Sequence, residues 1–214
     1  MRETGEYYDS VRADILPLLP ERLIRVLEIG CGTGNTLQWL RKHRGCEWLG
    51  GVERYPDAAA QARKKADVVY EGDIEQLELP VPKASLDLIL CLDVLEHLID
   101  PWRVTSRLRE LIRPGGALII SVPNIRNRDI IFPLLFKGKW DYAAAGVLDR
   151  THLRFFVRET AIDLVESSGL KVDRIHETGL ERKTKKSRMF ISLLPEGIRS
   201  FLVLQYLIRG IKTE

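Results

Sequence analysis

The sequence predicts an α/β fold built on a doubly wound, parallel sheet. Short apolar runs alternate with helix-like stretches over residues 25–122, and this alternation is typical of parallel strands joined by right-handed crossovers. A glycine-rich turn joins the first apolar run to the first of these helices. The chain has 214 residues, of which 45% are hydrophobic, so it has the size of one domain with a sizeable core.

The stretch before the first strand, residues 7–19, predicts an amphipathic helix that caps one edge of the sheet. Its apolar residues recur at helical spacing, namely Tyr8, Val11, Ile15 and Leu18. Pro20 ends it. Tyr8 and Arg12 are candidate ligand contacts, with packing or capping as the alternative.

The remaining elements follow in order. Strands are predicted over residues 26–29, 46–52, 67–70, 85–92 and 117–122, with helices over 33–43, 56–65 and 101–112. The segment Arg113-Pro114-Gly115-Gly116 predicts a tight turn. Further along, we expect a helix over 158–168, a strand over 170–175, a short helix over 190–201 interrupted at Pro195-Glu196-Gly197, and a last strand over 202–211.

The glycine turn has the pattern Glu28-x-Gly30-x-Gly32-x-Gly34. A strand, a glycine turn and a helix in succession place a ring of backbone N–H groups at a helix N-terminus, where a ligand can approach the backbone closely. The spacing differs from the G-x-G-x-x-G pattern of dinucleotide sites. A carboxylate at Glu28 would repel a pyrophosphate and would suit a ligand that carries an ammonium group.

Two further carboxylates follow strand ends. Glu53 comes about twenty residues after the turn, at the spacing of an acidic residue that accepts both ribose hydroxyls of an adenosine. The fourth strand runs directly into Asp93-Val94-Leu95-Glu96-His97. Because this strand lies beside the first one in a doubly wound sheet, its end overlooks the glycine turn, where ligands of open α/β sheets bind.

The ordered set of motifs resembles the class I S-adenosylmethionine (SAM)-dependent methyltransferases, and among them a bacterial branch similar to ubiquinone-type O-methyltransferases. The matching motifs are Glu28-x-Gly30-x-Gly32-x-Gly34, Glu53, Gly72-Asp73, Asp93 to His97, and Arg113-Pro114-Gly115-Gly116. The resemblance implies a Rossmann-like, seven-stranded, mostly parallel sheet whose antiparallel last strand lies before strand six. It implies one domain over 1–214, with a cofactor-binding half over 25–122, a lid insertion over 126–157 and a sheet edge over 158–214.

The resemblance also implies the cofactor SAM and a set of residues that contact it. In such sites an Asp after the third strand accepts from the adenine amino group and the next apolar residue packs on the ring; the alternative for Asp73 is that it caps a turn. The expected contacts are Glu28, Gly30, Gly32, Gly34, Asn35, Glu53, Asp73, Ile74, Leu92, Asp93 and Val94.

Three mechanisms for methyl transfer stay open. His97 or His152 can act as a general base, since histidine titrates near neutral pH. By resemblance to ubiquinone-type and small-RNA 2′-O-methyltransferases, Asp93, Glu96, His97 and His152 can instead hold a divalent metal. Asp93 stands where those enzymes often carry a longer Glu. In the third mechanism the protein only aligns the acceptor with the methyl group, without a histidine base or a metal ion.

The resemblance implies O-methylation of a small hydroxylated acceptor, such as a sugar or a surface-polysaccharide precursor. The aromatic-rich segment 126–148 is expected to be a substrate lid, with a packing helix as the alternative. Three other functions stay open. The first is a metal-assisted RNA 2′-O-methyltransferase, suggested by the Glu-His run and the basic cluster over 183–188, and the second is a non-catalytic SAM-binding protein. The third is an NAD-dependent oxidoreductase, although the sequence shows no Tyr/Lys or similar pair for a hydride-transfer site.

The composition of the chain limits the classes of partner and the cellular compartment that we expect. The net charge of +3, from 33 basic and 30 acidic residues, is too mild to argue by itself for a nucleic-acid or membrane partner, and we expect a small-molecule acceptor and no nucleic acid. No apolar run approaches the ~20 residues of a membrane span. Three cysteines without ligand spacing predict reduced core thiols, and the polar start is no signal peptide, so we expect a cytoplasmic protein. We expect a monomer or a homodimer.

Overall fold

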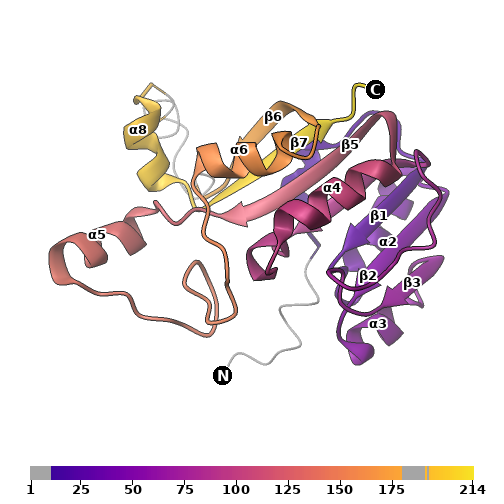
Figure 1. Cartoon of the computed structure of the whole chain (residues 1–214), viewed down its shortest axis with the longest axis horizontal. Coiled ribbons are helices and arrows are strands. Elements are labelled where there is room, and N and C mark those ends of the chain that lie inside the picture. Colours follow the sequence, from indigo (N-terminus) through magenta and orange to yellow (C-terminus); the bar gives the residue numbers. More distant parts are fainter. Residues whose placement is uncertain (1–10, 180–190, 192) are drawn as a thin grey trace.

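The computed structural model describes residues 11–179, 191 and 193–214 and has one seven-stranded sheet in the order β3-β2-β1-β4-β5-β7-β6 (Figure 1). The strands are β1 (Arg25–Ile29), β2 (Trp48–Glu53), β3 (Val68–Glu71), β4 (Leu86–Leu92), β5 (Ile112–Pro123), β6 (Lys171–Glu177) and β7 (Gln205–Ile211). β1 to β5 pair in parallel, and β7 is antiparallel to both β5 and β6. The predicted doubly wound sheet and the placement of its last strand are confirmed.

Helices cover both faces of this sheet. They are α2 (Asn35–Arg44), α3 (Pro56–Ala62), α4 (Pro101–Leu111), α5 (Arg128–Lys137), α6 (Arg158–Glu166) and α8 (Glu196–Arg199), with 3-10 turns η1 (Ala13–Leu18), η2 (Leu95–His97) and η3 (Ser200–Leu202). Successive strand residues face opposite sides: Val26 packs in one apolar cluster and Leu27 in the other. The strands are therefore buried on both faces, as parallel strands usually are.

Two expectations at the beginning and middle of the chain were wrong. Within the described part of the leading segment, residues 11–19, Ala13–Leu18 forms a 3-10 helix and not the expected α-helix, and it contains Pro17, which lacks the N–H that an α-helix needs. Tyr8 lies outside the described residues. The predicted tight turn at 113–116 belongs to β5, whose pairing with β4 shifts register between Leu86 and Leu88. Gly115, with φ +75°, takes up this irregularity.

The C-terminal part also differs in detail. β7 begins at Gln205, because Ser200–Leu202 forms the η3 turn. α8 begins at Glu196, where an interruption of the helix was expected. The three cysteines are free and buried, as predicted. No helix in the described ranges has the length and apolar character to cross a bilayer.

The order of the strands determines where in the sheet a ligand-binding crevice opens. It reverses between β1 and β4, so the crossovers leaving these two strands diverge and open a crevice at their carboxyl ends. The glycine turn follows β1 and the Asp93 segment follows β4. Beyond the same edge, α5 and the long loop after it project away from the sheet (Figure 1).

Candidate functional site

The glycine turn adopts a backbone that only glycine adopts without strain. Gly30, Gly32 and Gly34 have φ of +68°, +54° and +78°. A Cβ on Gly30 would lie 2.5 Å from Cγ2 of Val94, so the turn and the segment after β4 are in direct contact. The N–H groups of Gly30 and Cys31 donate to the carbonyl of Val52, at 2.8 and 3.0 Å, which fixes the turn on β2.

Glu53 holds the glycine turn from the end of β2. Its side chain is buried, and Oε2 accepts from the N–H of Gly32 at 2.8 Å while Oε1 accepts from the N–H of Tyr55 at 2.9 Å. A carboxylate offers about four lone-pair sites. Glu53 therefore keeps acceptor capacity for ligand hydroxyls while its orientation is fixed by the backbone.

Glu28 lies within β1 with a buried side chain, and its Oε2 has no hydrogen-bond partner in the described part of the chain. Burial raises the pKa of Glu28 to about 8; the Arg12 charge opposes this rise and the Glu53 charge adds to it. An unpartnered buried acid of this kind is costly unless a cation or donor joins it. The position therefore suits a positively charged ligand.

Replacing Glu28 with glutamine should change how the stability of the ligand-free protein depends on pH. Because folding raises the pKa of Glu28 from 4.5 to about 8, the folded protein keeps a proton that the unfolded chain releases. The stability due to this proton is complete below the unfolded pKa and is lost as pH rises through the folded pKa. Glutamine cannot titrate. The unfolding free energy of Glu28→Gln, relative to that of the wild type, should therefore rise by about 2–4 kcal/mol between pH 5 and pH 8.

Urea unfolding of both proteins at the two pH values measures this difference. Glu47→Gln, at an exposed glutamate, is the matched control and should leave the pH dependence as it is. A stability difference between Glu28→Gln and the wild type that is the same at pH 5 and pH 8 would contradict the expected proton uptake by Glu28.

The other expected cofactor contacts lie around the same crevice. Oδ1 of Asp73 accepts from the N–H of Glu75 at 2.9 Å, so Asp73 caps the turn after β3, whereas Oδ2 lies 3.8 Å from Arg54. Ile74 and Leu92 are buried. Asn35 begins α2 and accepts from Nζ of Lys65 at 2.5 Å.

Asp93 occupies a strained position at the end of β4, with φ +57° on a residue that has a side chain. Its Oδ2 forms an ion pair of 2.5 Å with Arg12, and its Oδ1 accepts from Ser121 and from Nε2 of Gln205, the latter at 2.8 Å. Both oxygens of Asp93 thus bind groups of the protein. Asp93 is not among the residues whose potential ligand atoms lie within 4.8 Å of one another in the described part of the chain.

Glu96, His97 and His152 come together, with one potential ligand atom from each within 4.8 Å of the others. The two imidazole rings meet edge to face with centroids 4.7 Å apart. Glu96 is 1% exposed, and neither carboxylate oxygen has a hydrogen-bond partner among the described residues. Burial and the Asp93 charge raise the pKa of Glu96, whereas burial and the neighbouring His152 lower the pKa of His97.

Hydrogen bonds fix the tautomers of both histidines. Nδ1 of His152 lies 2.9 Å from the Val147 carbonyl, which can only accept, so this nitrogen carries the proton. Nδ1 of His97 lies 2.9 Å from Oγ1 of Thr151, whose own proton goes to Asp149 at 2.7 Å. His97 therefore donates to Thr151. In both rings Nε2 keeps a free lone pair, as a general base or a metal ligand requires.

A hollow of about 180 Å³ opens beside this cluster. Its walls come from the ends of β4, β5 and β7 and from the loop after α5. It is lined by Asp93, Glu96, Pro123, Gly146, Val147, Asp149, His152, Leu204 and Gln205. Most of its functional groups are carboxylates, an amide and an imidazole, which suit a ligand with several hydroxyl groups.

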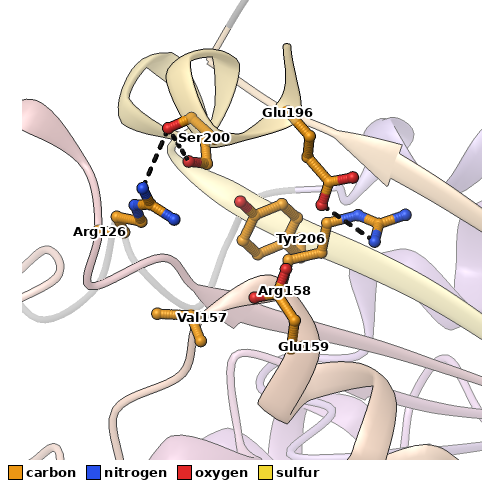
Figure 2. A pocket seen from close by; sticks show the side chains of 8 residues that line it. Arg126, Val157, Arg158, Glu159, Glu196, Ser200 and Tyr206 are labelled. Atoms are coloured by element: carbon orange, nitrogen blue, oxygen red, sulfur yellow. Dashed lines mark hydrogen bonds and ion pairs between the residues drawn. The ribbon is translucent and has the colours of Figure 1, made fainter.

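A second hollow, of about 220 Å³, lies between α6, α8 and β7 and contains none of the expected site residues. Figure 2 shows the Tyr206 ring among Arg126, Arg158 and Ser200. Arg158 pairs with Glu196 at 3.1 Å, and Arg126 donates to the Gly197 carbonyl at 3.1 Å. These contacts join α8 to the rest of the chain.

The structure adds residues that the sequence analysis missed. Ser121 and Gln205 bind Asp93, and Thr151 orients His97. Ser121 and Gln205 carry no local signal, because strand pairing brings them in from distant parts of the chain. The Asp149-x-Thr151 pair did carry one: Oδ1 of Asp149 accepts from the N–H of Thr151 at 2.8 Å, as in an Asx turn.

The fold and the crevice define a SAM-dependent methyltransferase with a Rossmann-like fold. The chain belongs to the methyltransferase domain family, since the family model described as "Methyltransferase domain" matches residues 2–175.

Individual relatives agree with this family. The chain is 29% identical over 181 residues to the ubiquinone biosynthesis O-methyltransferase of Coxiella burnetii, covering 78% of this chain and 71% of that protein. It is 34% identical over 103 residues to the 27-O-demethylrifamycin SV methyltransferase of Amycolatopsis mediterranei, covering 45% and 38%. A SAM-dependent methyltransferase structure from Archaeoglobus fulgidus is similar in fold, with a TM-score of 0.67 and 22% identity over 94% of this chain and 92% of that one.

Proposed function

We propose that this protein transfers the methyl group of SAM to a hydroxyl of a small, polyhydroxylated acceptor of the sugar type. The hollow beside His152 is the observation that carries the proposal, because carboxylate, amide and imidazole groups line it together at the end of β4. The two O-methyltransferase relatives favour oxygen as the methylated atom.

SAM itself occupies the glycine turn in this proposal. Glu53 accepts the ribose hydroxyls, Asp73 and Ile74 hold the adenine, and the buried carboxylate of Glu28 faces the positively charged end of the cofactor. A sulfonium methyl is already a strong electrophile, so the protein has to align the acceptor oxygen, exclude water and remove a proton. Nε2 of His152, which lines the hollow, takes that proton.

The same cluster suits a divalent metal ion as a second candidate mechanism. Glu96 offers two buried, unpartnered oxygens, and the tautomers of His97 and His152 leave a lone pair on each Nε2. Two imidazoles and a carboxylate are a ligand set of zinc, iron, cobalt and similar ions. A metal held there would lower the pKa of an acceptor hydroxyl.

Metal removal separates the two mechanisms. If His152 acts as a base without a metal, turnover should survive dialysis against EDTA. If a metal assists, turnover should be lost on dialysis and restored by one equivalent of Zn²⁺, Co²⁺ or Mn²⁺, and His97→Ala should lose Mn²⁺ binding in electron paramagnetic resonance while it still binds SAM.

The acceptor class is tested by offering methyl-labelled SAM with sugars and nucleotide sugars, phenols, amines and RNA. The proposal expects the label in an ether of a sugar-type acceptor. Label in an amine or in RNA would contradict it. Because the basic cluster at 183–188 lies outside the described residues, the RNA arm of this experiment is the direct test of that alternative.

A further inference from the structure

The helix α5 exposes an unusual amount of apolar surface. Residues 130–136 form an unbroken run of seven apolar residues, and none of the ten residues of α5 is buried. Leu135 is 70% exposed and Phe136 is 74% exposed. A helix that is apolar all round normally lies in a core or in lipid. In the described part of the chain Ile130, Ile131 and Pro133 are partly covered, whereas the other apolar residues of α5 are exposed.

Neighbouring residues extend this surface. Phe132 of α5 contacts the Phe201 ring of η3, with centroids 5.7 Å apart. Ile198 of α8 is 54% exposed, and Leu193 just before α8 is 78% exposed. Figure 1 shows α5 and α8 at the same end of the molecule, beyond the sheet. We call the exposed apolar residues of these two helices, with Leu193, the α5–α8 patch.

Basic residues stand at both ends of α5. Arg126 and Arg128 flank its beginning, and Lys137 and Lys139 flank its end. Over residues 126–142 there are four basic and two acidic residues, which leaves a net charge of +2. A ten-residue helix is about 15 Å long. Arg128 pairs with Asp129 and Arg126 lies over the Phe201 ring, whereas Lys137 and Lys139 are exposed, so positive charge is available mainly at the end of α5.

We propose that the α5–α8 patch docks on the surface of an anionic lipid bilayer, with α5 lying flat at the boundary between headgroups and acyl chains. Successive residues of a helix point about 100° apart, so the apolar run faces every direction around α5. The exposed Lys137 and Lys139 at the end of this run match the anionic headgroups of a bilayer, whereas a second copy of the protein has the same net charge of +3. Trp140 and Tyr142 follow as aromatic residues of the kind that favour this boundary.

Docking has a consequence for the acceptor, and this step rests on the proposed function. α5 stands between Pro123, at the end of β5, and the loop that carries His152, and both residues line the acceptor hollow. A docked α5 brings this hollow to the membrane surface. The acceptor is then the hydroxylated headgroup of an amphipathic molecule whose apolar part stays in the bilayer.

Co-sedimentation of the full chain with vesicles tests the docking, using pure phosphatidylcholine and mixtures of phosphatidylcholine with phosphatidylglycerol. We expect partitioning that is at least about tenfold stronger on the anionic mixture. The double variant Leu135→Ser, Phe136→Ser should weaken it by about tenfold or more. Lys137→Gln with Lys139→Gln should remove the preference for anionic lipid.

Ile99→Ser is the matched control, because Ile99 is 67% exposed but lies in the loop before α4, outside the patch. It should partition like the wild type. SAM affinity is measured for every variant; unchanged values show an intact fold and keep this test separate from that of the methyltransferase chemistry. Failure of the wild type to partition, or equal partitioning of the double variant, overturns the proposal. If the wild type forms a dimer and does not bind vesicles, and the double variant is a monomer, the proposal is overturned and the patch binds a second copy of the protein.

Discussion

Replacing His152 with alanine should abolish methyl transfer while SAM still binds within a few-fold of its wild-type affinity. His152 lines the acceptor hollow, and its Nδ1–H is held by the Val147 carbonyl so that Nε2 is the free nitrogen. Loss of a general base costs about 10²–10⁴-fold in rate. His152 comes from the loop after α5, whereas the glycine turn and Glu53, which we expect to hold SAM, lie at the ends of β1 and β2.

Steady-state turnover and calorimetric SAM titration measure the two quantities separately. His43→Ala is the matched control, because His43 lies at the exposed end of α2, stacked on Trp39. Partial rescue of His152→Ala by imidazole would favour a proton acceptor. Turnover of His152→Ala within twofold of the wild type would remove His152 from the mechanism.

The second large effect is expected on SAM binding when Glu53 becomes glutamine. Oε2 of Glu53 accepts from the N–H of Gly32, and an amide NH₂ in its place would set donor against donor. A charge-assisted bond to a ribose hydroxyl would be lost as well. Hydrogen bonds to charged groups contribute about 1.5–3 kcal/mol, so we expect the dissociation constant of SAM to rise by about 10–100-fold.

Calorimetry with SAM measures this change, and Glu47→Gln is again the exposed control. Thermal unfolding without SAM distinguishes a damaged turn from a lost ligand contact. If Glu53→Gln binds SAM as tightly as the wild type, the ribose is held elsewhere and the assignment of Glu53 is wrong.

Much of the cofactor crevice could be predicted because its signals are local. The glycines at 30, 32 and 34 are required by a backbone with positive φ, and Glu53 follows at a fixed distance along one crossover. The strand order followed from the alternation of elements and from family resemblance. These features depend on short stretches of sequence, in which backbone geometry allows few substitutes.

Other features depend on contacts that no local pattern encodes. Arg12, Ser121 and Gln205 meet at Asp93 from three distant segments, and their engagement of both carboxylate oxygens is what sets Asp93 apart from Glu96. The segment 113–116 has the composition of a turn; it lies within β5 but has no partner in β4, because the pairing passes from Leu86↔Ile112 to Leu88↔Ala117. The 3-10 form of Ala13–Leu18 likewise follows from Pro17, although the apolar spacing favoured an α-helix.

The lid remains a prediction. The segment 126–157 does project from the sheet edge and supplies Gly146, Val147, Asp149 and His152 to the acceptor hollow. Its helix α5 has no buried residue, so the alternative of a helix packed on the sheet edge does not describe it. Movement on acceptor binding is the property that would make it a lid.

The central claim is that an acid-lined glycine turn after β1 holds SAM. The crystal structure of the protein grown with SAM tests it most directly. We expect the cofactor along the carboxyl ends of β1 and β2, with its ribose hydroxyls on Glu53 and its positively charged end toward Glu28. An empty turn at saturating SAM, or a cofactor that contacts neither carboxylate, would contradict the account.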